Sequence, residues 1–320
     1  MTLRLMLPLL ALAAFALSLA LPAGPIARLL DQDQALATAV LIELRLPRAL
    51  LALVYGAMLG ASGAAIQALF ANPLASPDLT GTTSGAALGA VLTAYIAGFS
   101  APLALSLGAV AGALCALLLL LALAGPKAET ATLLLSGLAI SALAGALTTL
   151  ALALAPSPFA FYDAYEWLMG SLVDRSLSQA AFAALPALLA ILLLARERRA
   201  LDSLSLGEEV AQSLGHDVAG LRRRIVVLTA VGVGACVAIC GAIGFIGLVA
   251  PIFARRLTGG HPGRAILPAA LIGGALLLAA DLVVRLAPLG RTLPIGVVTA
   301  LLGAPFFLWL VAHMRWKLGR

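Results

Sequence analysis

The chain has 320 residues, of which 62% are hydrophobic and 11% charged, and its mean hydropathy is +1.10. Soluble domains are about 45–50% apolar and about 25% charged, so this composition excludes a soluble globular domain and indicates a polytopic membrane protein. The apolar runs are continuous rather than alternating, so we expect an all-α fold and not a β-barrel. The net charge of +6 is explained by basic residues gathered on one side of a membrane, and we expect no nucleic-acid partner.

Apolar runs separated by polar breaks predict about ten transmembrane helices in a single membrane domain, residues 1–320. The predicted spans are 5–24, 48–70, 82–98, 102–124, 131–154, 179–195, 225–242, 244–257, 265–287 and 295–313. The first run imitates a secretory signal, but we expect an uncleaved span because nine further segments follow it. The run 244–257 is shorter than the roughly 20 residues that a crossing needs, so we expect it to be broken, tilted or buried in protein.

The distribution of basic residues predicts the orientation. With the N-terminus in the cytoplasm, most of the 20 Lys and Arg residues fall in cytoplasmic loops and at the C-terminus. This agrees with the positive-inside rule and with an even number of spans, so both termini are expected in the cytoplasm. The residues left outside are Arg28, Arg45, Arg48, Arg175, Arg285 and Arg291.

Arg45 and Arg48 open the second span on the side that this rule disfavours. Two interpretations stay open. Their long side chains can snorkel to the membrane surface as helix-end anchors. Alternatively, an acidic partner docks on them from outside.

A turn-rich segment follows the second span, and related residues recur 178 positions later. Asn72-Pro73 ends the span, and Thr83 and Ser84 open the next one. The offset covers five crossings, so the two halves, about 45–178 and 223–313, are predicted to be inverted in topology, as in many transporters. We expect irregular segments near Pro73 and Pro251. The matched positions are Gly63-Ala64 with Gly241-Ala242, Pro73 with Pro251, Leu79-Thr80-Gly81 with Leu257-Thr258-Gly259, and Gly85 with Gly263.

The longest cytoplasmic loop, residues 196–224, contains an amphipathic helical pattern. Ser205 with Glu208 predicts a capping box, and Gly215 predicts the helix end. A folded amphipathic element in a loop favours a partner surface over a solvated connection. The apolar positions of the pattern are Leu204, Leu206, Val210 and Leu214, and its acidic ones include Glu208 and Glu209.

The sequence contains no nucleotide-binding, metal-binding or catalytic motif that we recognise. It has no P-loop sequence, its three cysteines and three histidines have no metal-ligand spacing, and we expect no metal, cofactor or catalytic site. Asp281 is the main ionisable residue within a span, and Arg285 at i,i+4 is predicted to pair with it. A transporter without a nucleotide site or an ion relay must take its energy from an ATPase partner. An ion-coupled secondary transporter is the alternative from another class.

Four segments, in this order, resemble the permease subunits of bacterial ABC importers for ferric siderophores, haem and cobalamin (FecCD type). They are "RLPRALLALVYGAMLGASGAAIQALFANPLASPDLTGTTSGAALGAVL", "LDSLSLGEEVAQSLG", "GAIGFIGLVAPIFARRLTG" and "DLVVRLAPLGRTLPIGVVTALLGAPFFLWLV". The resemblance runs from about residue 43 to the C-terminus.

The resemblance implies a bacterial inner-membrane protein that pairs with a second permease, identical or homologous, with two cytoplasmic ATPase subunits and with a periplasmic binding protein. It implies that Arg45 and Arg48 receive acidic residues of the binding protein, with Arg291 on the same docking surface. It also implies that the Leu206-Gly207-Glu208 loop contacts the ATPase and that Thr83 and Ser84 line the pore. The segment "NPLASPDLTG" resembles siderophore members more than cobalamin ones, which tend to have Gly where Asp78 stands. The resemblance therefore implies a ferric siderophore as substrate, with haem as the runner-up and cobalamin as a further alternative.

Overall fold

The computed structural model describes residues 2–95, 102–125, 130–287 and 293–318, which are nearly all helical, with 84% helix and no strand. In chain order the elements are α1 (Thr2–Ala20), α2 (Ala23–Gln32), α3 (Gln34–Ala39), the π-helix η1 (Val40–Arg45), α4 (Leu46–Leu69), the 3₁₀-helix η2 (Pro77–Thr80), α5 (Thr82–Tyr95), α6 (Pro102–Ala124), α7 (Thr130–Ala153), α8 (Pro158–Leu168), α9 (Leu177–Arg196), α10 (Arg198–Leu204), α11 (Glu208–Ser213), α12 (Val218–Cys240), α13 (Ile246–Leu257), the 3₁₀-helix η3 (Gly263–Ala265), α14 (Ile266–Leu286) and α15 (Ile295–Leu318).

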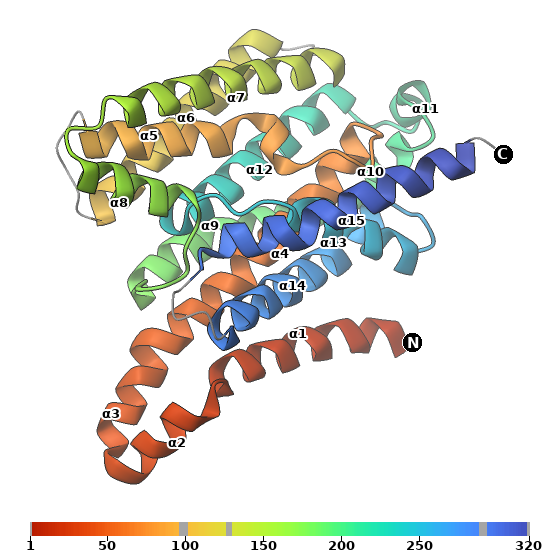
Figure 1. Cartoon of the computed structure of the whole chain (residues 1–320). Coiled ribbons are helices and arrows are strands. Elements are labelled where there is room, and N and C mark those ends of the chain that lie inside the picture. Colours follow the sequence, from red (N-terminus) through yellow and green to blue (C-terminus); the bar gives the residue numbers. More distant parts are fainter. Residues whose placement is uncertain (1, 96–101, 126–129, 288–292, 319–320) are drawn as a thin grey trace.

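The helices form a bundle around α4, which packs against α9, α12, α13 and α14. Helices α5, α6 and α7 pack together on one flank, and α1 lies along α14 on the other (Figure 1). Figure 1 also shows both chain ends at the end of the bundle where α10 and α11 lie, with α2, α3 and α8 at the opposite end. We refer to these as the inner and outer ends, following the orientation that the basic residues predict.

Every predicted span corresponds to a helix, but the helices differ in length. Within the described residues, six stretches are long and apolar enough to cross a membrane: Gln34–Leu69, Leu103–Ala124, Thr130–Ala153, Leu177–Arg196, Val218–Cys240 and Gly263–Leu286. Helices α1 and α15 contain shorter apolar stretches, and α5 and α13 are only 14 and 12 residues long. The count of about ten spans is therefore not confirmed: the described residues combine six helical stretches of span length with shorter elements.

The helix that contains the predicted second span begins well before residue 48, because one continuous helical stretch runs from Gln34 through η1 to Leu69. Polar residues such as Glu43 and Arg45 suggest a loop in the sequence. The structure tolerates them in a helix because Glu43 is exposed at the outer end and Arg45 has acceptors at the end of α1 and in the turn after it.

A seam of glycines lets α4 and α14 touch backbone to backbone. A Cβ atom at Gly56 would collide with the carbonyl of Gly273, and one at Gly60 with the carbonyl of Ala269. Small residues at such spacing allow the close helix approach on which packing in lipid depends. The close contact between α4 and α14 therefore depends on positions that have no side chain.

This seam makes a direct prediction for stability. Gly60→Val should lower the thermal stability of the purified protein by an amount equivalent to about 1–3 kcal/mol or more, since a branched side chain would have to displace the α14 backbone. Gly145→Val on α7 is the matched control, because a Cβ there meets nothing within 4 Å. Equal melting temperatures for the two variants would contradict the close packing of α4 and α14.

The irregular segment of the second half lies at Gly241–Phe245, not near Pro251. Gly241 and Phe245 have φ of +72° and +65°, and the chain breaks there between α12 and α13. Pro251 instead lies inside α13, where its missing N–H leaves the carbonyl of Gly247 without its helical donor. Gly63 of α4 packs directly on that carbonyl, so the proline shapes a helix contact rather than a break.

Tyr55 holds this break against α4. Its hydroxyl donates to the carbonyl of Gly241 (3.1 Å) and accepts from the backbone N–H of Ile243 (3.2 Å). The side chain is fully buried. A non-helical backbone inside the bundle needs such partners, since lipid offers none.

Candidate functional site

The inner end carries a surface of exposed apolar residues on and beside α11. Leu206, Val210 and Leu214 are 67%, 43% and 60% exposed. Three such side chains near the inner end of a membrane protein, in a segment too polar to be in lipid, are typical of a partner contact. We call Leu206, Val210 and Leu214 the inner apolar surface.

Two details of this loop differ from the sequence prediction. Ser205 does not cap α11, because it ends α10 and its hydroxyl donates to the carbonyl of Asp202; Gly207 precedes α11 instead, with φ of +109°. Leu204 is partly buried against the core, so it anchors α10 rather than joining the exposed surface. Gly215 has φ of +87° directly after the helical segment, which fits its predicted role as a stop.

Polar contacts tie α10 and α11 to the long helices. Glu208 forms an ion pair with Arg222 of α12, and Glu197 accepts from Arg224 at 2.7 Å. The Asp202 carboxylate accepts from the backbone N–H of Gly263 at 2.8 Å, which links α10 to the start of α14. Glu209 is exposed. Short polar contacts therefore join α10 and α11 to α12 and to the segment before α14.

The segment between α4 and α5 forms a compact turn at the inner end. The Asn72 side chain accepts from the backbone N–H of Leu74 at 2.9 Å, and Pro73 follows it outside any helix. Thr83 and Ser84 lie half-buried in the first turn of α5. Gly81, with φ of +75°, packs on Gly137 and Ile140 of α7.

A buried carboxylate near the outer end holds two arginines at once. Asp281 is fully buried; its Oδ1 lies 2.7 Å from a terminal nitrogen of Arg48 and 2.8 Å from its Nε. Its Oδ2 lies 2.5 Å from Arg285, the i,i+4 partner that the spacing predicts. Arg285 also donates to the carbonyl and hydroxyl of Ser18. The result is an ionic clasp, made of Arg48, Asp281 and Arg285, that joins α4 to α14.

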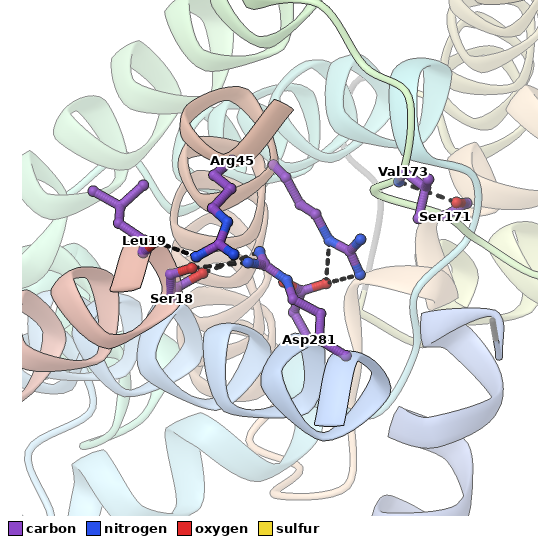
Figure 2. Close-up of polar contacts among 8 residues, drawn as sticks. Ser18, Leu19, Arg45, Ser171, Val173 and Asp281 are labelled. Atoms are coloured by element: carbon purple, nitrogen blue, oxygen red, sulfur yellow. Dashed lines mark hydrogen bonds and ion pairs between the residues drawn. The ribbon is translucent and has the colours of Figure 1, made fainter. Parts of the chain in front are cut away.

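Arg45 extends this clasp to α1. Its guanidinium donates to the carbonyls of Leu19 (2.7 Å) and Pro22 (2.8 Å), and Figure 2 shows it directed at the end of α1 beside Asp281. Arg45 and Arg48 are therefore both bonded inside the chain, and Arg48 also lines an outer hollow. Their docking role stays a prediction. Arg291 lies outside the described residues.

Two neighbouring hollows open on the outer end beside the clasp. The larger, of about 600 Å³, lies between Arg48, η1 and the start of α9. The smaller, of about 330 Å³, lies between α8 and Leu293-Pro294. They share Val173, Asp174 and Arg175, so the connection from α8 to α9 forms the wall between them. Sequence reasoning missed these hollows, because the segments that line them lie far apart in the chain.

The described residues contain no group of three or more His, Cys, Asp or Glu side chains that could hold a metal ion. The described charged side chains that form ion pairs join helices at the two ends, and the core between the ends is mostly apolar. This arrangement is that of a helical membrane protein with exposed apolar residues at its inner end and hollows at its outer end.

Comparison with known proteins gives the family. Residues 5–313 match the FecCD transport family, and the chain belongs to it. It is 41% identical to the vitamin B12 import system permease protein BtuC of Vibrio cholerae, over 85% of this chain and 82% of that protein. It is 37% identical to the Fe(3+) dicitrate transport system permease protein FecD of Escherichia coli, over 86% of each.

A solved structure shares the whole fold. It is an inward-facing transporter assigned to the metal-chelate ABC type, with a TM-score of 0.87, 32% identity and coverage of 98% of this chain and 99% of that one. The family resemblance seen in the motifs is thus confirmed over nearly the full length, and the chain is an ABC transporter permease.

Proposed function

We propose that this chain forms the translocation pathway of an ATP-driven importer for a ferric siderophore or a similar ferric chelate. It works with a second permease, two cytoplasmic ATPase subunits and a periplasmic binding protein in a bacterial inner membrane, with both termini in the cytoplasm. The match over residues 5–313 carries the importer assignment. The relative that imports Fe(3+) dicitrate and the Asp78 of the Asn72–Gly81 turn support iron as cargo.

The contacts suggest how the energy of ATP reaches the pathway. The ATPase covers the inner apolar surface, and its movement displaces α11. The Glu208–Arg222 and Asp202–Gly263 links pass that displacement to α12 and α14. The Asn72–Gly81 turn, with Thr83 and Ser84 after it, and the α12–α13 break before Pro251 supply the irregular backbone that such a rearrangement needs.

Uptake measurements with a panel of substrates test the cargo. Proteoliposomes with the full complex should accumulate labelled ferric siderophore or ferric citrate in preference to cobalamin and haem. A cobalamin importer is the second candidate, because the vitamin B12 permease relative is 41% identical to this chain and the iron relative 37%. Accumulation of cobalamin alone, or of haem alone, would overturn the iron assignment and leave the importer assignment in place.

A further inference from the structure

Helix α9 presents a row of exposed leucines that ends in an arginine. Leu185, Leu189 and Leu192 are 75%, 56% and 61% exposed, and their spacing of four and three residues places them on one face of the helix. We call these three residues the leucine stripe. Arg196 follows four residues after Leu192, in the last turn of α9, and is exposed as well. Exposed leucines of a membrane-spanning helix face hydrocarbon, so Arg196 lies where the lipid headgroups begin.

The start of α14 repeats this arrangement at the same corner of the inner end. The η3 turn continues directly into α14; Arg264 is exposed, and Leu267, three residues later, is 50% exposed. The η3 turn packs against α10, because a Cβ atom at Gly263 would collide with the carbonyl of Arg198. Helix α10 begins two residues after α9 ends, so Arg196 and Arg264 belong to one corner, where α9, α10 and η3 meet.

The acids at this corner are committed to partners within the chain. Glu197 forms an ion pair with Arg224, and the Asp202 carboxylate accepts a hydrogen bond from the backbone of η3. In the part of the chain that the structure describes, neither Arg196 nor Arg264 forms an ion pair. The corner therefore combines two exposed cations with exposed apolar side chains on the membrane side of each.

We propose that Arg196 and Arg264 hold the phosphate of an anionic phospholipid of the inner leaflet, with an acyl chain along the leucine stripe. A guanidinium matches a phosphate with paired hydrogen bonds. A lipid fits both parts of the surface because it joins an anionic head to an apolar tail. A soluble ATPase could cover the arginines but not leucines at bilayer depth. The inference goes beyond the proposed cargo and needs only the orientation of the chain in the membrane.

Lipid binding to the purified full-length chain with its ATPase subunits tests the site, by titration in detergent followed with native mass spectrometry. Wild type should bind phosphatidylglycerol more tightly than phosphatidylcholine. Arg196→Gln with Arg264→Gln should weaken phosphatidylglycerol binding about tenfold, since basic residues at the membrane surface attract anionic headgroups, and should leave phosphatidylcholine binding unchanged. Both side chains are exposed, so the variant should fold, which size-exclusion chromatography checks.

Two further variants separate charge from geometry and from position. Arg196→Lys with Arg264→Lys should lose less affinity than the glutamine pair, because lysine keeps the charge and loses only the paired hydrogen bonds. Arg28→Gln is the matched control, since Arg28 is also an exposed arginine but lies on α2 at the outer end. It should bind phosphatidylglycerol like wild type.

Three results would overturn the lipid site. The first is equal phosphatidylglycerol affinity in wild type and in the glutamine pair. The second is displacement of the lipid by an equal concentration of inorganic phosphate, which would show a site for a free anion. The third is loss of the ATPase subunits with unchanged lipid binding, which would show that the arginines contact the ATPase. The measurement needs no transport, so a failure of the importer assignment would leave the lipid site standing.

Discussion

Asp281→Asn is expected to reduce the amount of folded protein in membranes more than removal of either arginine that Asp281 holds. The fully buried carboxylate compensates two guanidinium groups, from Arg48 and Arg285. Neutralising it leaves both without a counter-ion, and breaking a buried ion pair from one side costs about 3–5 kcal/mol. Arg48→Gln or Arg285→Gln alone leaves Asp281 with one cation, so each should cost less.

Double variants show whether the clasp acts as a unit. Asp281→Asn with Arg285→Gln should recover part of the loss seen in Asp281→Asn alone, because fewer cations remain unpaired. The measurement is the monodisperse fraction on size-exclusion chromatography, with thermal melting of the purified protein. Strictly additive losses, or an Asp281→Asn protein as stable as wild type, would show that the three side chains do not depend on one another. Charge reversal at Arg45 and Arg48 would damage this clasp, so lost docking in such a variant could not be assigned to docking alone.

Leu206→Asp is expected to separate ATP hydrolysis from uptake or to release the ATPase subunits. Leu206 is exposed in the isolated chain and would be covered in the complex, and covering one such side chain stabilises a contact by about 1.5–3 kcal/mol. An Asp at position 206 would remove this stabilisation and would add the cost of desolvating a carboxylate in the contact. The bilayer-embedded part should fold normally, because Leu206 is 67% exposed.

The matched control is Gln212→Asp, which adds the same charge to α11 at an exposed position on another helix face. Co-purification of the ATPase and substrate-stimulated ATP hydrolysis are measured for both variants. Normal hydrolysis and uptake in Leu206→Asp would rule out the inner apolar surface as the ATPase contact. An equal defect in Gln212→Asp would show only that α11 tolerates no added charge.

The features that sequence reasoning predicts well are local ones. The period of Leu206, Val210 and Leu214 indicates an amphipathic element, and the structure exposes all three. The i,i+4 spacing of Asp281 and Arg285 places both on one helix face, and the structure has them paired. In each case the physical cause lies within a few residues.

The features that it misses depend on distant partners. Arg48 joins Asp281 from 233 positions away, so no local pattern shows that a predicted docking residue is held inside the chain. The α12–α13 break falls at Gly241–Phe245 because Tyr55 and the segment before α9 supply hydrogen bonds there, whereas Pro251 fits within its helix. Whether Asn72, Pro73, Thr83 and Ser84 line a pathway stays a prediction, as do Arg291 and the inverted repeat.

Reconstituted transport tests the central claim most directly. The chain is assembled in proteoliposomes with its ATPase and binding protein, and uptake of a labelled ferric chelate is followed with ATP, with a non-hydrolysable analogue, and with imposed proton or sodium gradients. An ABC importer permease should support uptake only when hydrolysable ATP, the ATPase and the binding protein are all present, and ion gradients should have no effect. Uptake driven by an ion gradient in vesicles that contain this chain alone would contradict the account and establish a secondary transporter.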